Sequence, residues 1–108
     1  MLYLRKFMLM TLFVVWAASA LAQRSEPHNY KPEVGYVPDA ATAIRIAVAV
    51  WGPIYGEKII AAEAPFRAVL KDNVWTVEGF LPKGHVGGVA IAEISKKDAT
   101  ILRISHGK

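Results

Sequence analysis

The sequence contains no cysteine, and this absence excludes several kinds of protein. No disulfide can stabilise the fold, no thiolate can bind zinc, and no cysteine can carry a lipid anchor. Histidine is also scarce: no two of His28, His85 and His106 have the spacing of metal ligands on one helix or hairpin. We therefore expect neither a metal site nor a cofactor.

The sequence also lacks a strong charge of one sign. Its formal net charge is +4, and the basic residues are scattered without the interleaved aromatic side chains of a single-strand binding groove. Residues 83–88 are rich in glycine, but they lack the Lys-Ser or Lys-Thr ending and the following helix of a phosphate-binding loop. We therefore expect no nucleic-acid partner and no phosphate ligand.

The most apolar part of the sequence is its N-terminus, which has the layout of a signal peptide. Arg5 and Lys6 precede an apolar run over residues 7–18, and Ala20-Leu21-Ala22 supplies the small residues before a cleavage site. A stable membrane-spanning helix needs roughly 20 apolar residues, more than this run offers. We predict that residues 1–22 are removed and that the protein is periplasmic or otherwise secreted, without a membrane anchor.

The remaining chain divides into an arm and one domain. Residues 23–38 mix prolines and a glycine with polar residues, which indicates an extended arm, and residues 39–108 form the domain. Asp39 is a good N-cap, and the apolar run that follows it predicts a helix covered on most sides. We expect Gly52-Pro53 to break or kink this helix.

The second half of the domain has the character of strands. We expect five of them, over residues 58–62, 66–71, 74–80, 89–95 and 100–105. A turn at Asp72-Asn73 would pair the second strand with the third and set Arg67 opposite Glu78. A helix followed by such a meander predicts an α+β fold, an NTF2-like or cystatin-like cone with a curved antiparallel sheet of four to five strands.

The register of the last hairpin depends on the length of its loop. A four-residue loop would turn Arg103 into the core, whereas a three-residue loop over residues 97–99 would bury Leu102 and Ile104. The shorter loop also sets Glu93 opposite Arg103. We expect this second register because it buries the apolar pair.

Several short stretches, taken in order, resemble one known family. They are Gly35-Tyr36-Val37-Pro38-Asp39, AVAVWGPIYGE at 47–57, KDNVWTV at 71–77, LPKG at 81–84 with Gly87-Gly88, EISKKD at 93–98, and HGK at 106–108. With them, residues 35–108 resemble the NTF2-fold immunity proteins of bacterial polymorphic toxin systems. The resemblance implies a protein that binds and neutralises a cognate toxin, and it brings no catalytic motif. The chain departs from the family at Ala99, where glycine is usual in the last turn.

Charged residues of the predicted sheet face and long loop are the candidate partner-binding residues. They are Arg67, Glu78, Lys83, His85, Glu93 and Arg103. Glu78 and Glu93 could form an acid and base pair, but an arginine opposite each keeps a carboxylate ionised, so we expect no enzyme.

Two other functions stay open from the sequence alone. The protein could bind a small ligand or act like an isomerase, with Tyr55 lining the cavity of the cone, or it could be a structural component of the envelope. Trp51, Tyr55 and Trp75 are otherwise expected in the core. Fold alone does not decide among these functions, because one scaffold hosts many.

Overall fold

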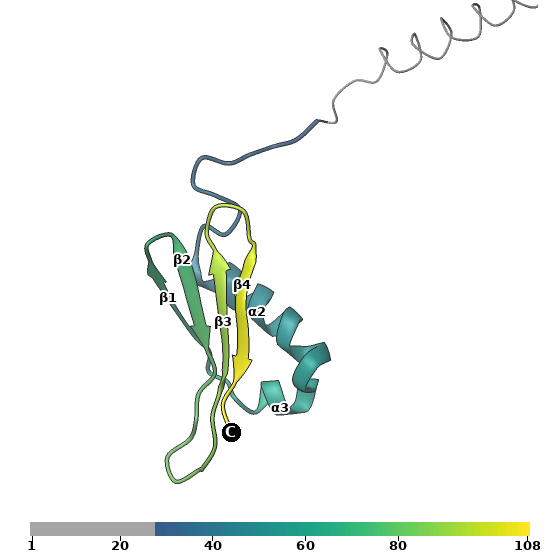
Figure 1. Ribbon diagram of the computed structural model, residues 1–108, viewed down its shortest axis with the longest axis vertical. Helices are drawn as coiled ribbons and strands as arrows, with labels where there is room; N and C mark the ends of the chain where they lie inside the picture. Colours follow the sequence, from purple (N-terminus) through teal and green to yellow (C-terminus); the bar gives the residue numbers. More distant parts are fainter. Residues whose placement is uncertain (1–27) are drawn as a thin grey trace, which may run out of the picture. The chain divides into compact units, whose positions relative to one another are not determined.

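The computed structural model describes residues 28–108, so the predicted signal peptide and the start of the arm lie outside the described residues. Lys31–Lys108 forms one compact unit. The unit contains, in chain order, α2 (Ala40–Tyr55), α3 (Glu57–Ala61), β1 (Arg67–Lys71), β2 (Val74–Glu78), β3 (Ala90–Ser95) and β4 (Ile101–His106), as labelled in Figure 1. The strands form one antiparallel sheet in the order β1-β2-β3-β4.

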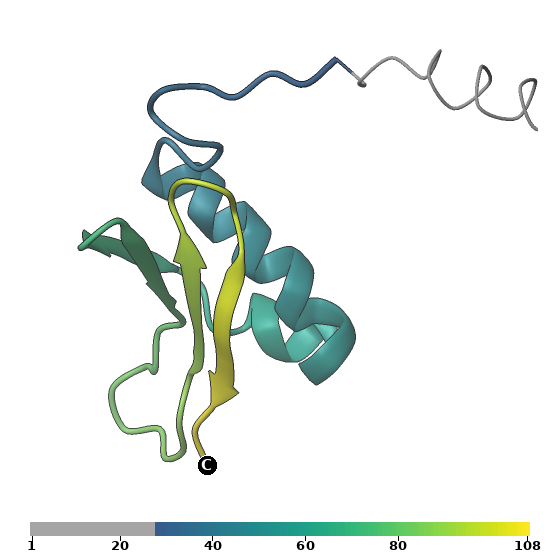
Figure 2. The ribbon, with the colours of Figure 1, turned by 45° about the horizontal axis from the view of Figure 1, so that its top comes forward.

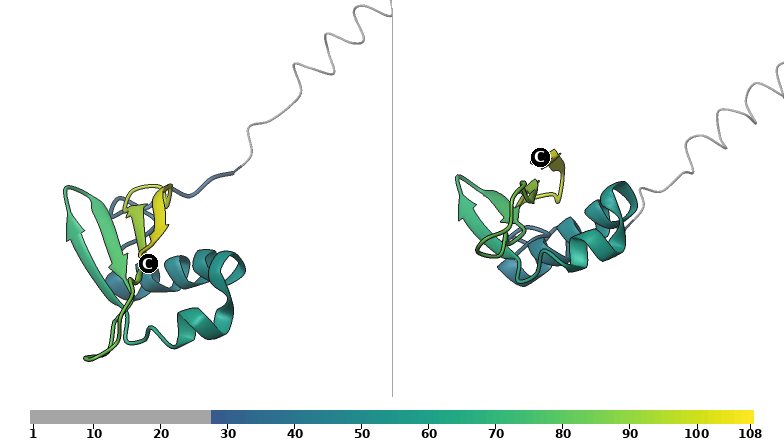
Figure 3. Two further views of the ribbon diagram at one scale, coloured as in Figure 1. Left: turned by 60° about the horizontal axis from the view of Figure 1, so that its bottom comes forward. Right: turned by 90° about the horizontal axis from the view of Figure 1, so that it is seen from below.

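The helices lie on one side of the sheet, and Figures 2 and 3 show this two-layer arrangement from three directions. α2 crosses the sheet and contacts β1, β2 and β3, while α3 packs against α2. Neither helix covers the opposite side, which we call the outer face. The α+β fold expected from the sequence is therefore confirmed.

α2 begins where the sequence predicted and ends later. The backbone N–H of Thr42 donates to Asp39 Oδ1 at 2.7 Å, which confirms Asp39 as the N-cap. The helix continues through Pro53 to Tyr55, so Gly52-Pro53 does not break it, and the kink that the sequence offered as the alternative stays a prediction. Pro53 lies in the last turn, where the missing N–H removes only one bond of the helix, and Gly56 at φ 102° follows as the C-cap.

The predicted strand over residues 58–62 is also wrong, because these residues lie mainly in α3. The N–H of Ile60 donates to the carbonyl of Gly56 at 3.1 Å, and the N–H of Ala62 to that of Lys58 at 3.1 Å, which is the pattern of a helix. The neighbouring isoleucines favoured a strand by propensity. Burial of Ile60, which is 1% exposed, overrides that preference, and the sheet has four strands.

The core lies between α2 and the sheet. Large buried side chains from both layers meet there, including Trp51, Trp75 and Ile94. Small alanines separate them, and Ala43, Ala47, Ala90 and Ala92 are fully buried. Because alanine has a short side chain, α2 can lie close to β3. The expected core positions of Trp51 and Trp75 are confirmed.

The end of the arm adds to this domain, a point that the sequence left open. Val37 is fully buried, and its carbonyl accepts a hydrogen bond from Trp75 Nε1 at 2.9 Å. The N–H groups of Tyr36 and Val37 donate to the carbonyls of Lys97 and Lys96, each at 3.0 Å. The arm therefore closes the end of the sheet that holds the β1–β2 and β3–β4 turns.

The first hairpin has the predicted register. Lys71 pairs with Val74 across Asp72-Asn73, whose φ values of 50° and 60° lie in the left-handed region that such a turn requires. Arg67 stands opposite Glu78.

The last hairpin combines both registers that the sequence offered. The N–H of Ser95 donates to the carbonyl of Thr100 at 2.9 Å, so the loop spans residues 96–99 and the predicted three-residue loop is wrong. A bulge then shifts the register between Glu93 and Ile94 and leaves Leu102 as the extra residue of β4. Leu102 is 54% exposed, which contradicts its predicted burial.

The bulge nevertheless restores the predicted pairing beyond it. Glu93 stands opposite Arg103, and Ile104 stands opposite Ala92 and packs against the core, both as expected. Ala99 has φ 63°, in the left-handed region where glycine would be unstrained.

Candidate functional site

Four of the six candidate residues meet on the outer face. Arg67 on β1 stands opposite Glu78 on β2, and Glu93 on β3 stands opposite Arg103 on β4. Arg67, Glu78 and Arg103 are exposed, and Glu93 is half-buried. Across residues 28–108 the one ion pair lies elsewhere, so these four charges remain available to a partner.

The other two candidates, Lys83 and His85, lie on the long connection between β2 and β3. This β2–β3 loop (residues 79–89) projects past the end of the sheet, at the bottom of Figure 1. Its tip is exposed, and Val86 is 99% exposed. The structure therefore separates Lys83 and His85 from the outer face and places them at the end of the sheet far from the arm.

A buried glutamate that the sequence reasoning missed holds both ends of this loop. Glu63 is 9% exposed, and its carbonyl accepts the N–H of Phe80 at 2.6 Å. Its Oε1 accepts the N–H of Ala90 at 2.7 Å. Because Phe80 follows β2 and Ala90 begins β3, one residue fixes the start and the end of the β2–β3 loop.

His106 completes this arrangement as an ion pair with Glu63. Its Nε2 lies 2.8 Å from Glu63 Oε2, and its Nδ1 lies 2.7 Å from the carbonyl oxygen of Gly107. Both partner atoms are acceptors, so both contacts are hydrogen bonds when the ring carries two protons. The Gly107 carbonyl, and after it the Glu63 carboxylate, raise the pKa of His106 above its usual value. The structure therefore favours an imidazolium here.

Gly79 was the signal in the sequence that could have revealed this site. It directly follows β2 and continues the alternation of the buried Trp75 and Val77, so an apolar side chain would be expected there. A Cβ at Gly79 would collide with the side chain of Glu63, so only glycine leaves room for the buried carboxylate. Tyr55 packs beside the pair, with its ring centroid 5.1 Å from that of His106.

An apolar groove lies between α2 and α3. Its volume is about 550 Å³, and it is lined by Val48, Ala49, Gly52, Pro53, Glu57, Ile60, Ala61, Ala64 and Phe66. Tyr55 is absent from this lining and packs against His106 instead, with the two rings tilted by 53°. Glu78 and Glu93 also lie outside it, so the groove has no pair of inward carboxylates.

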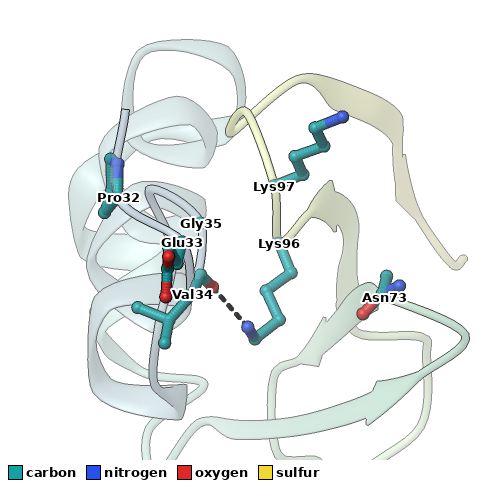
Figure 4. A pocket seen from close by; sticks show the side chains of 7 residues that line it. All are labelled: Pro32, Glu33, Val34, Gly35, Asn73, Lys96 and Lys97. Carbon is teal, nitrogen blue, oxygen red and sulfur yellow. Dashed lines mark hydrogen bonds between the residues drawn. The ribbon is translucent and has the colours of Figure 1, made fainter. Parts of the chain in front are cut away.

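The arm end of the sheet holds a second, more polar pocket, shown in Figure 4. It has a volume of about 350 Å³ and is lined by Pro32, Glu33, Val34, Gly35, Asn73, Lys96 and Lys97. Lys96 Nζ donates to the carbonyl of Val34 across the pocket. This hydrogen bond ties the arm to the β3–β4 loop.

Neither end of the domain contains a cluster of metal ligands. Within residues 28–108, no three histidine, aspartate or glutamate side chains gather closely enough to hold a metal ion. In the same part of the chain, no helix is long and apolar enough to cross a membrane.

Comparison with known proteins identifies the family. The chain is 42% identical over 55 residues to uncharacterized protein YbbC of Escherichia coli (strain K12), covering 50% of this chain and 45% of that protein. It is 34% identical over 73 residues to uncharacterized protein YhhH of the same organism, covering 67% of this chain and 58% of that protein. The chain thus spans about half the length of these relatives, and no solved structure matches it. Residues 42–108 match the family described as NTF2 fold immunity protein, and the chain is a member of that family.

Proposed function

We propose that this protein is an extracytoplasmic immunity protein that binds and neutralises one cognate bacterial toxin. The observation that carries the proposal is the family match over residues 42–108, which supports a toxin-neutralising role in general and suggests a protein that is not an enzyme. The signal peptide predicted over residues 1–22 supports export. An exported immunity protein would meet toxins that arrive from outside the cytoplasm.

The outer face supports binding as the means of neutralisation. It is part of a hydrogen-bonded sheet, and it carries two arginines and two glutamates that have no ion-pair partner within residues 28–108. A toxin surface of complementary charge would associate faster and would be distinguished from wrong partners. A rigid surface also loses little entropy on binding.

The α2–α3 groove supports a second candidate, a binding site for a small apolar ligand. Its volume lies in the range of ligand pockets, and its lining is mostly apolar, as such pockets require. Glu57 is its one ionisable lining residue, so the groove offers no acid and base pair for isomerase chemistry. Ligand binding in this groove is compatible with the fold, but it would not involve the outer face.

The test of the main proposal is protection of cells. Candidate toxins encoded by neighbouring genes would be exported, one at a time, to the periplasm of cells that contain the full chain, a chain lacking residues 1–22, or neither. We expect only the cells that contain the full chain to be protected. Protection by both chains would contradict the extracytoplasmic location, and no protection together with no binding to the purified toxin would favour the small-ligand function.

Charge reversal on the outer face would test the contact residues. Arg67→Glu and Arg103→Glu should each weaken toxin binding, whereas Arg45→Glu should not, because Arg45 is an exposed arginine on α2. Equal affinity in all three variants would show that the toxin binds elsewhere on the domain.

A further inference from the structure

The tip of the β2–β3 loop carries the most exposed large apolar side chain in residues 28–108. Val86 is 99% exposed, whereas the next, Tyr30, is 75% exposed. Lys83 and His85 precede Val86 and are exposed as well. A single apolar side chain beside basic residues at the end of a projecting loop has the form of an anchor for a concave partner.

The base of this loop is fixed although its tip is rich in glycine. Gly79 N–H donates to the carbonyl of Ala90 at 2.9 Å, and Gly107 N–H donates to that of Val89 at 3.2 Å. Glu63 holds Phe80 and Ala90, as described above. Gly88 lies so close to Gly107 that a Cβ would overlap its backbone. The loop is therefore presented from a constrained base, which lowers the entropy lost when its tip binds.

From this geometry we infer that the β2–β3 loop is a second toxin-binding element, which inserts Val86 into an apolar depression of the toxin whose rim is acidic. The inference rests on the proposed function, because the partner is the same toxin. Val86 would supply the buried contact, and Lys83 would face carboxylates at the rim. His85 would add a donor at the rim and, when protonated, a second charge.

A protein partner fits this tip better than a lipid bilayer. One valine side chain buries little apolar surface, and even a single acyl chain gives only marginal membrane binding. A protein pocket can instead enclose the side chain on all sides and exclude water from it. We therefore expect Val86 to bind the toxin and to leave membranes untouched.

The test compares Val86→Asp with a matched control, Ile54→Asp, in the mature protein. Ile54 is 56% exposed on α2, outside the loop, so both variants place a carboxylate at an exposed apolar position. Calorimetry with the purified toxin that the protection assay identifies should show an affinity lower by about 10- to 100-fold for Val86→Asp and little change for Ile54→Asp. Circular dichroism would confirm that both variants fold.

The outcomes separate this inference from the proposed function. If the wild-type protein binds and Val86→Asp binds equally well, the loop is not a contact element while the function stands. If the wild-type protein does not bind, both fail. Lys83→Glu should slow association most at low salt, and an unchanged rate would contradict the acidic rim. Binding of the wild-type protein, but not Val86→Asp, to phosphatidylglycerol vesicles would overturn the inference in favour of a membrane contact.

Discussion

The two ends of the sheet are closed by different chemistry. At the arm end, the indole N–H of Trp75 donates to the carbonyl of Val37, and both groups are neutral and buried. At the loop end, the buried carboxylate of Glu63 pairs with His106 and accepts the N–H of Ala90. The arm end should therefore be insensitive to pH between about pH 6 and pH 9, where carboxylates stay ionised. The loop end depends in that range on the protonation of one histidine, and it also fixes a candidate binding loop.

The largest effect is expected at the arm end. Trp75→Ala should lower the free energy of unfolding by about 3–5 kcal/mol, because it leaves a cavity beneath Val37 and removes a buried hydrogen bond. Urea denaturation would measure the loss, with Trp75→Phe as the control that keeps most of the volume. The loss should be the same at pH 6 and pH 9, and a loss that varied with pH would show that the arm end is not a neutral contact.

At the loop end, Glu63→Ala should lower the free energy of unfolding by roughly 1–3 kcal/mol. The substitution leaves the buried N–H of Ala90 without its acceptor and removes the partner of His106. Hydrogen exchange should show faster exchange at Ala90 while the amide of Val37 keeps its protection. Equal acceleration at both amides would mean that the two ends do not open independently.

The two ends of the sheet should differ most clearly in how their contribution to stability depends on pH. The pKa of His106 is raised in the folded protein, so its protonated form stabilises the fold below the usual pKa of histidine. That contribution should be lost as pH rises through the raised pKa. The difference in stability between the wild-type protein and His106→Gln should therefore shrink from pH 6 to pH 9, as measured by urea denaturation. A difference that grew with pH would contradict an imidazolium paired with Glu63.

The sequence predicted the local features of the domain better than its long-range contacts. Asp39, the turn at Asp72-Asn73 and the cross-strand pairs are local features, which residue type and spacing determine. The Glu63–His106 pair joins residues 43 positions apart, and no local pattern places them together. The bulge at Leu102 was missed for the same reason, since burial of the whole sheet decides how an extra loop residue is absorbed.

A smaller effect is expected at the last turn, which belongs to the arm end. Ala99→Gly should raise the free energy of unfolding by up to about 1 kcal/mol, because Ala99 has φ 63° and glycine adopts that conformation without strain. Thermal denaturation would detect the gain. A clear loss would contradict the left-handed conformation.

The smallest effect is expected at the bulge. Leu102→Ala should change the free energy of unfolding by less than about 0.5 kcal/mol, because the side chain is 54% exposed. Ile94→Ala, at a fully buried position of the neighbouring strand, is the matched contrast and should cost about 2–5 kcal/mol. Similar losses of free energy of unfolding in the two variants would show that Leu102 faces the core.

The most direct test of the central claim is the affinity of the mature protein for the candidate toxins encoded by genes next to its own. Isothermal titration calorimetry with the two purified proteins should show saturable binding that Arg67→Glu and Arg103→Glu weaken and Arg45→Glu leaves unchanged. No heat of binding, together with full toxin activity in the presence of excess protein, would contradict the claim that this protein neutralises its toxin by binding it.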